Sequence, residues 1–206
     1  MQRTTRTLIS AAATTAAAVL ALGTATAAHS ATHPDRFGHT RVRASIPQHT
    51  PRFTVTSPEL AHGTFPAADY ASSFGCTGAN HAPSLHWSGA PASTRSYAIS
   101  MFDQDAPTGS GFWHWMTWDL PGTTTTLVGP APAGMVTGTT DAGTAGYLGP
   151  CPPVGDVAHH YVIRVVALDV PTLGLAADST PALASFSLAM SGHIVGTAEL
   201  TAAARR

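Results

Sequence analysis

Two short runs of the sequence combine acidic, histidine, glycine and proline residues at spacings that could build a chemical site. They span residues 103–115 and 146–161. Only 10% of the residues in the chain are charged, so these groups are expected to converge on one place. A catalytic centre, a metal site and a ligand pocket are all open at this point. The candidate side chains are Asp103, Asp105, His114 and His159.

The first run follows an apolar segment, residues 96–102, that predicts a strand. In extended chain, residues two apart point to the same side, so Asp103 and Asp105 can face one cavity. Pro107 then fixes the backbone, because the residue before a proline is held extended. His114 lies between two tryptophans, and in a strand its imidazole would point away from both indoles.

The second run is rich in glycine and proline and predicts a rigid loop. Gly149 permits backbone geometry that other residues resist. Such a loop can direct the backbone N–H groups of Leu148, Gly149 or Cys151 at an anion. His159 comes just before the strongest strand candidate, residues 161–168, and so also lies at a strand end.

Each candidate also has an ordinary structural interpretation. An aspartate after a strand often forms a turn, and the chain has 11 histidines. A Gly-x-Ser-x-Gly nucleophile, a His-Glu-x-x-His zinc motif and nucleotide-binding glycine loops are absent from the sequence. His159 and His160 face opposite ways in a strand and cannot both bind one metal. A metal-dependent hydrolase built from two aspartates and two histidines stays open as a minor alternative.

The two cysteines, Cys76 and Cys151, are expected to form a disulfide. An isolated pair in an exported protein is more often bridged than free. The bridge would stabilise the fold by roughly 4 kcal/mol in the chain-entropy model. The alternative is two buried, reduced thiols that pack as small hydrophobic groups.

The N-terminus has the pattern of an export signal. Arg3 and Arg6 precede an apolar stretch at residues 8–22, and small residues at 25–27 fit a cleavage site. We therefore expect a cleaved signal peptide over residues 1–27 and a secreted or extracytoplasmic protein. An uncleaved anchor is the alternative, although the stretch is short for a membrane span.

Residues 28–51 have no periodic apolar pattern and predict a disordered linker. Residues 52–206 have the length of one domain. All ten basic residues are arginine and form no basic stripe, which disfavours nucleic acid as a partner. No amphipathic or polybasic segment near the candidate site indicates stable membrane insertion.

The domain is predicted to be mainly β. Short alternating or β-branched segments predict strands, and glycine and proline punctuate the intervals. Thr180 and Pro181 predict the start of a helix over residues 181–190. Residues 193–204 fit either a second helix or a final strand. The predicted strands are residues 53–57, 85–87, 96–102, 115–120 and 161–168.

With both runs in view, the chain resembles the phosphatidylethanolamine-binding protein family, specifically its bacterial Raf-kinase-inhibitor-like branch. The resemblance extends from about residue 53 to residue 200. Besides the two runs, it is carried by Ser57-Pro58, Phe74-Gly75-Cys76-Thr77-Gly78, Asn80, Pro83-Ser84-Leu85-His86-Trp87 and Pro91.

The resemblance implies a large central antiparallel sheet, a smaller sheet, short C-terminal helices and a small anion pocket at one end. In the family this pocket holds phosphate-like groups, including phosphorylethanolamine, and neither a cofactor nor a catalytic residue is implied. Gln104 stands where the family usually has proline, which bears on ligand preference. Asp103, Asp105, His114 and His159 match the pocket positions, Tyr147, Gly149 and Pro150 match the framing loop, and Pro107 matches a rim position.

The leading functional hypothesis is a secreted, non-enzymatic protein that binds a small anionic or zwitterionic phosphate ligand. Two carboxylates repel phosphate, so a protonated histidine or a ligand ammonium has to compensate. The alternative that the resemblance implies is an inhibitor or regulator of a protein target, such as a serine protease or a kinase.

Overall fold

The computed structural model describes residues 46, 47 and 49–206. The predicted signal at residues 1–27 and most of the predicted linker lie outside the described residues. None of the helices in the described part is long and apolar enough to cross a membrane.

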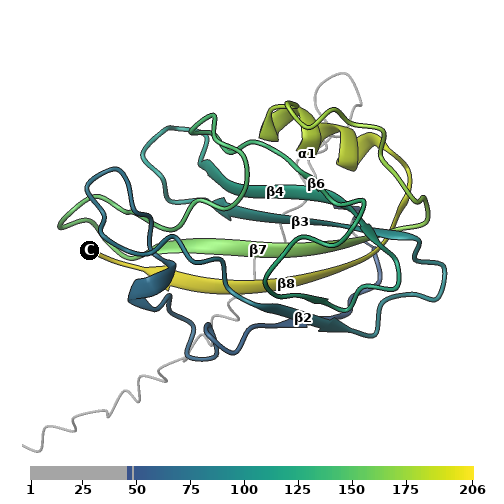
Figure 1. The fold of residues 1–206 in the computed structure, drawn as a ribbon, viewed down its shortest axis with the longest axis horizontal. Coiled ribbons are helices and arrows are strands. Elements are labelled where there is room, and N and C mark those ends of the chain that lie inside the picture. Colours follow the sequence, from purple (N-terminus) through teal and green to yellow (C-terminus); the bar gives the residue numbers. More distant parts are fainter. Residues whose placement is uncertain (1–45, 48) are drawn as a thin grey trace, which may run out of the picture. The chain divides into compact units, whose positions relative to one another are not determined.

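The fold is built on two antiparallel sheets (Figure 1). The larger sheet has five strands in the order β6-β4-β3-β7-β8, and the smaller has three in the order β1-β2-β5. The predicted mainly β architecture is therefore confirmed. The strands are β1 (Thr54–Thr56), β2 (Leu85–Ser88), β3 (Ser96–Asp103), β4 (Phe112–Pro121), β5 (Thr126–Leu127), β6 (Val136–Thr137), β7 (His159–Leu168) and β8 (Ile194–Ala204).

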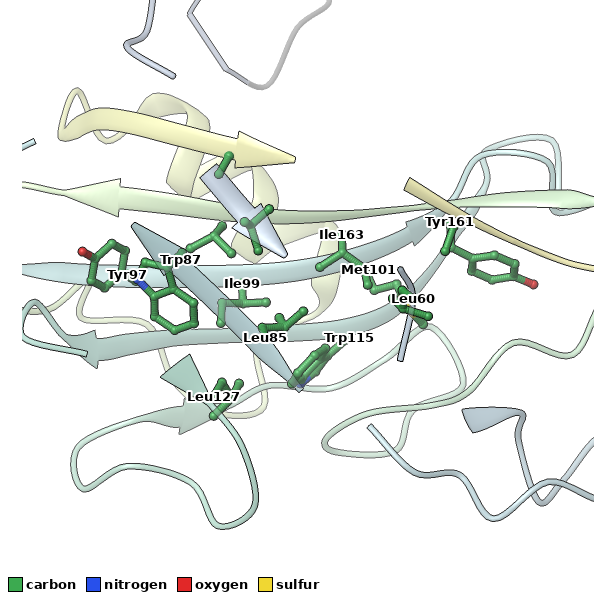
Figure 2. Close-up of a cluster of buried hydrophobic side chains, with 14 of the residues drawn as sticks. Leu60, Leu85, Trp87, Tyr97, Ile99, Met101, Trp115, Leu127, Tyr161 and Ile163 are labelled. Atoms are coloured by element: carbon green, nitrogen blue, oxygen red, sulfur yellow. The ribbon is translucent and has the colours of Figure 1, made fainter. Parts of the chain in front are cut away.

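The main core lies between the two sheets (Figure 2). Leu85 and Trp87 of β2 face Ile99 of β3 and Trp115 of β4, and all four side chains are buried. β3 is buried along nearly its whole length, as expected for a central strand covered on both faces. Burial of each large apolar side chain contributes about 1.5–3 kcal/mol, so this core fixes the register of the strands that carry the site.

One α-helix, α1 (Pro181–Met190), packs on the opposite face of the large sheet. The Thr180 side chain caps it by accepting a hydrogen bond from the backbone N–H of Leu183 at 3.3 Å, as the sequence predicts. Its buried residues Ala184 and Leu188 pack near β3 and β4. Of the short C-terminal helices that the resemblance implies, the described residues contain α1. Residues 194–204, which fit a helix or a final strand, pair with β7 as strand β8.

The N-terminal end of the described chain contacts this sheet. The backbone N–H of Thr197 donates to Pro51 O at 2.9 Å, and that of Phe53 donates to Thr197 O at 3.0 Å. Ile46 packs against the cluster beneath α1. The last residues of the predicted linker therefore contact the domain.

Antiparallel pairing brings the two chemical runs together at one end of the large sheet. Asp103, the last residue of β3, pairs with Phe112 at the start of β4 and with Tyr161 near the start of β7. His159 pairs with Ala204, the last residue of β8. This end lies beside the label C in Figure 1.

Candidate functional site

A small cavity of about 120 Å³ opens at this end of the sheet. Five of the eight predicted ligand-binding residues line it: Asp103, Pro107, His114, Gly149 and His159. Its remaining walls come from the loops on either side and from the start of β4. These residues are Phe74, Ala106, Phe112, Leu148, Cys151 and Pro152.

A buried acid–histidine pair lies behind one wall of the cavity, whose exposed lining is almost entirely apolar. His159 Nδ1 lies 2.8 Å from Asp103 Oδ2, and the two residues are 1% and 3% exposed. The other ring nitrogen, Nε2, lies 3.3 Å from the carboxylate of Asp156. Burial lowers the pKa of His159, but the bonds to Asp103 and Asp156 outweigh it, and the pKa is raised. When His159 is protonated, its one positive charge lies between two carboxylates.

His114 is held differently, because its hydrogen-bond partner is a neutral carbonyl. Its Nδ1 lies 3.0 Å from Leu148 O, so Nδ1 carries the proton and Nε2 is unprotonated in the neutral ring. Burial lowers the pKa of His114, which favours the neutral form. Its ring packs between Phe112 at 4.8 Å and Tyr161 at 5.1 Å.

Tyr161 places an unsatisfied hydroxyl beside this wall, and the sequence reasoning did not single it out. Its Oη is fully buried, with no hydrogen-bond partner in the described part of the chain. Burial and the nearby charge of Asp103 raise the pKa of Tyr161, so the hydroxyl stays protonated and can donate. The two-residue alternation of a strand, which places Tyr161 on the same side as His159, is the signal that could have found it.

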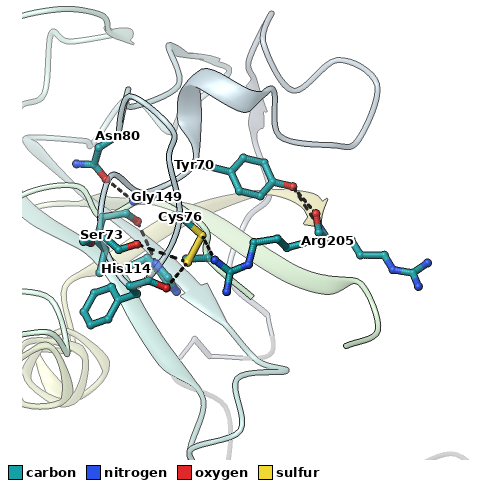
Figure 3. The surroundings of a disulfide bond; sticks show 11 residues. Tyr70, Ser73, Cys76, Asn80, His114, Gly149 and Arg205 are labelled. Carbon is teal, nitrogen blue, oxygen red and sulfur yellow. Dashed lines mark hydrogen bonds between the residues drawn. A yellow bond between two sulfur atoms is a disulfide. The ribbon is translucent and has the colours of Figure 1, made fainter. Parts of the chain in front are cut away.

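The loop that frames the cavity uses its backbone groups within the protein (Figure 3). The N–H of Gly149 donates to Asn80 Oδ1 at 2.7 Å, and the N–H of Leu148 donates to His114 O at 2.9 Å. The expectation that these two N–H groups face an anion is therefore wrong, since both already have partners. Gly149 also passes so close to the backbone of Asp69 that a side chain there has no room.

Tyr147 and Pro150 support this loop without lining the cavity. The hydroxyl of Tyr147 donates to Asp69 O at 3.1 Å, and its ring packs on Trp115 at 5.5 Å. Pro150 O accepts a hydrogen bond from the backbone N–H of Ala71 at 3.1 Å. The resemblance implies a framing role for both residues, and these contacts hold the loop in place.

Asp105 does not share the cavity with Asp103. Asp105 Oδ2 accepts two hydrogen bonds from His160. One comes from the backbone N–H at 2.7 Å and the other from the ring Nδ1 at 2.9 Å. The chain turns here because the backbone N–H of Asp105 donates to Asp103 Oδ1 at 2.9 Å, so the extended geometry ends at Asp103. The expectation that both carboxylates face one cavity rested on extended chain and is wrong.

The predicted disulfide between Cys76 and Cys151 is present, with an S–S distance of 2.01 Å. It ties the loop that carries Phe74 to the second run (Figure 3). Phe74 is 67% exposed and lies at the rim of the cavity, which Cys151 also lines. The bridge therefore fixes one wall of the site as well as closing a long loop.

A metal site is not assembled from the described residues: within residues 46, 47 and 49–206, His, Cys, Asp and Glu nowhere gather in a group of three or more that could hold an ion. With Asp105 turned toward His160, the four residues considered for a metal-dependent hydrolase do not converge. His159 and His160 do face opposite sides of β7, as predicted, since the first is buried and the second exposed.

The chain is similar to known proteins over most of its length. A family model described as "Phosphatidylethanolamine-binding protein" matches residues 56–205. The UPF0098 protein YbcL of Escherichia coli K12 is 42% identical over 158 residues, which cover 72% of this chain and 85% of the relative. The crystal structure of E. coli YbcL matches with a TM-score of 0.71 and 39% identity, covering 75% of this chain and 98% of that one. LppC of Mycobacterium tuberculosis, provisionally named a lipoprotein, is 37% identical over 153 residues, covering 71% and 72% of the two chains.

Proposed function

The chain belongs to the phosphatidylethanolamine-binding protein family, in its bacterial YbhB/YbcL branch, and on that premise we propose that it is a non-enzymatic binding protein. Its ligand is a small anionic or zwitterionic group that contains phosphate, such as phosphorylethanolamine. The proposed binding residues are Asp103, His114 and His159, with Pro107 and Gly149 as walls and Tyr147 and Pro150 as the supporting loop.

The observation that carries this proposal is the size and make-up of the cavity. At about 120 Å³ it is far below the roughly 300–1,000 Å³ of sites for drug-sized molecules, so it accommodates a head group and little else. Buried ionisable residues from both sequence runs are among those that line it, while Phe74 at the rim is exposed. A molecule larger than the head group would extend past Phe74 to the outside.

The charges favour a zwitterion over a simple anion. Asp103 and Asp156 outnumber the single positive charge of His159, so a bare phosphate dianion meets net negative charge. The ammonium of phosphorylethanolamine can instead lie against Asp103. The phosphate then takes a hydrogen bond from His114, whose pKa rises next to an anion. Binding should therefore be accompanied by proton uptake.

Calorimetric titration tests the proposal with phosphorylethanolamine, inorganic phosphate and ethanolamine from pH 5 to 8. We expect phosphorylethanolamine to bind more tightly than either fragment. The binding heats should depend on the ionisation enthalpy of the buffer. At pH values above the pKa of His114 in the free protein, this dependence should show that a proton is taken up on binding. Asp103→Asn should weaken binding, whereas Asp169→Asn, which changes an exposed Asp–His pair with His193 at 2.8 Å, should not. Undetectable binding of all three compounds over the whole pH range would overturn the proposal.

A second candidate function, an inhibitor of a protein target, is favoured by exposed apolar side chains around the cavity. Phe74 lies at the rim, and Val154 and Val157 flank Asp156, which bonds to His159. Such side chains can bury apolar area against a partner. Incubation with a panel of serine proteases tests this role. Inhibition that Phe74→Ser abolishes would support it, and full activity of every protease would count against it.

We also propose that the protein is exported through a signal at residues 1–27, with residues 28–51 as a linker. The disulfide supports an oxidising compartment, and the lipoprotein name of the LppC relative agrees with an extracytoplasmic location. Mass spectrometry of the exported protein tests this proposal. We expect a mature N-terminus near residue 28, and retention of Met1 in the exported form would contradict it.

A further inference from the structure

Asn80 lies outside the cavity but contacts the loop that frames it. It has a backbone φ of 54°, in the left-handed region that asparagine tolerates better than most residues. This conformation directs its half-buried side chain at the second run, as Figure 3 shows. Asn80 lies outside the strands, so strand pairing does not account for its conformation.

The amide of Asn80 holds the framing loop on both sides of one residue. Its Nδ2 donates to Tyr147 O at 2.9 Å, and its Oδ1 accepts from the N–H of Gly149 at 2.7 Å. The residue between these two is Leu148. A carboxamide offers a donor and an acceptor side by side, whereas a carboxylate offers acceptors only and alanine offers neither.

Leu148 is in turn bonded twice to His114. Its N–H donates to His114 O at 2.9 Å, and its carbonyl accepts from His114 Nδ1 at 3.0 Å. The loop has further anchors on either side, because Gly146 N–H donates to Gly138 O at 3.0 Å and Cys151 is in the disulfide. Between those anchors, the backbone groups of residues 147–149 hydrogen-bond to Asn80 and His114.

We propose that Asn80 is a positioning residue that fixes the tautomer of His114. By holding residues 147 and 149, it keeps the carbonyl of Leu148 directed at Nδ1, so the neutral ring carries its proton there and leaves Nε2 unprotonated. The wall of the cavity at His114 is then a hydrogen-bond acceptor, not a donor. The consequence for the ligand rests on the proposed function. For His114 Nε2 to hydrogen-bond the phosphate, either the phosphate must be protonated or His114 must take up a proton on binding.

The tautomer can be measured without any ligand. Long-range ¹H–¹⁵N correlation spectra of protein labelled with ¹⁵N at histidine distinguish a protonated nitrogen from an unprotonated one. For the wild type we expect the Nδ1–H pattern at His114 above its pKa. For Asn80→Ala we expect the two nitrogen shifts to move toward the averaged values of a tautomer mixture and the pKa of His114 to change. Asn80→Asp, which keeps the acceptor for Gly149 and loses the donor to Tyr147, should fall between them.

Two comparisons separate a positioning role from a general loss of structure. Thr77→Ala alters an exposed residue of the same loop and should leave the His114 shifts unchanged. The ring signals of His159 should stay in place in all variants, which shows that the sheet end is intact. If Asn80→Ala does not fold, the wild-type tautomer and Asn80→Asp still decide the question. An Nε2–H tautomer in the wild type, or unchanged His114 shifts in a folded Asn80 variant, would overturn the inference.

This test is independent of the proposed binding function. If His114 shows the expected tautomer and its loss in the variants while phosphorylethanolamine does not bind, the positioning role stands and the ligand assignment fails. If phosphorylethanolamine binds but the Asn80 variants leave the tautomer unchanged, the ligand assignment stands and the positioning role fails.

Discussion

Two Asp–His pairs lie at the same end of the large sheet and differ in almost everything except residue type. His159 Nδ1 lies 2.8 Å from Asp103 Oδ2 in a buried pair, whereas His160 Nδ1 lies 2.9 Å from Asp105 Oδ2 in an exposed pair. The acids are two residues apart in the chain and the histidines are adjacent. The hydrogen-bond distances in the two pairs are nearly equal, but the burial of the side chains is very different. Burial, and not hydrogen-bond length, therefore makes Asp103 and His159 the candidate site.

The largest effect should come from removing the buried carboxylate. Asp103→Asn leaves the histidinium of His159 with one charged partner fewer in a desolvated place, and breaking such a buried pair costs about 3–5 kcal/mol. We expect the free energy of unfolding to fall by about that amount at pH 6, measured by urea denaturation. A loss below about 1 kcal/mol would mean that the buried pair behaves like the exposed one.

The pH dependence of stability should separate the two pairs further. The raised pKa of folded His159 contributes stability that is fully present below the unfolded value, about 6.5, and is lost as the pH rises through the folded value. In urea denaturation from pH 5 to 9, the free energy of unfolding of the wild type should therefore fall relative to that of His159→Gln as the pH rises from about 6.5 through the folded pKa. Parallel stability curves for wild type and His159→Gln across this range would contradict the expectation.

The exposed pair, Asp105 and His160, should affect stability only weakly, and mainly at acid pH. Hydrogen bonds from His160 lower the pKa of Asp105, so its contribution is present above the unfolded value, about 3.9, and is lost as the pH falls through the folded value. Surface pairs contribute about 0–1 kcal/mol, and salt screens them. Asp105→Asn should therefore change unfolding by less than about 1 kcal/mol at pH 7, and less again in 1 M salt. A larger loss would show that the turn after Asp103 depends on this carboxylate.

The strands that carry the site could be predicted from the sequence because their patterns are local. The apolar segments at residues 96–102 and 161–168 correspond to β3 and β7, and Thr180 marks the start of α1. β5 and β6 have two residues each, which is too short for any periodic pattern. β8 is rich in small residues, so its sequence fits helix and strand alike until its pairing with β7 is known.

The site was less predictable because its details depend on tertiary hydrogen bonds. The pairing of Asp103 with His159 joins residues 56 apart in the chain, and the turn that directs Asp105 away uses the Asp103 carboxylate itself. The bonds that occupy the N–H groups of Leu148 and Gly149 come from β4 and from the loop at Asn80. None of these partners can be read from a local pattern, whereas the cysteine pair could be, because only two cysteines exist.

The disulfide also determines how the molecule would respond to a protease. Cys76 and Cys151 enclose β2 to β6, together with the glycine-containing loops at 104–111 and 128–134. A single cut in either loop would leave two fragments that remain covalently joined. Nicked protein should therefore migrate near its intact position on a non-reducing gel and separate into two bands only after a thiol is added. Because the fragments stay tethered, the two sequence runs can reassociate after the chain has been cut.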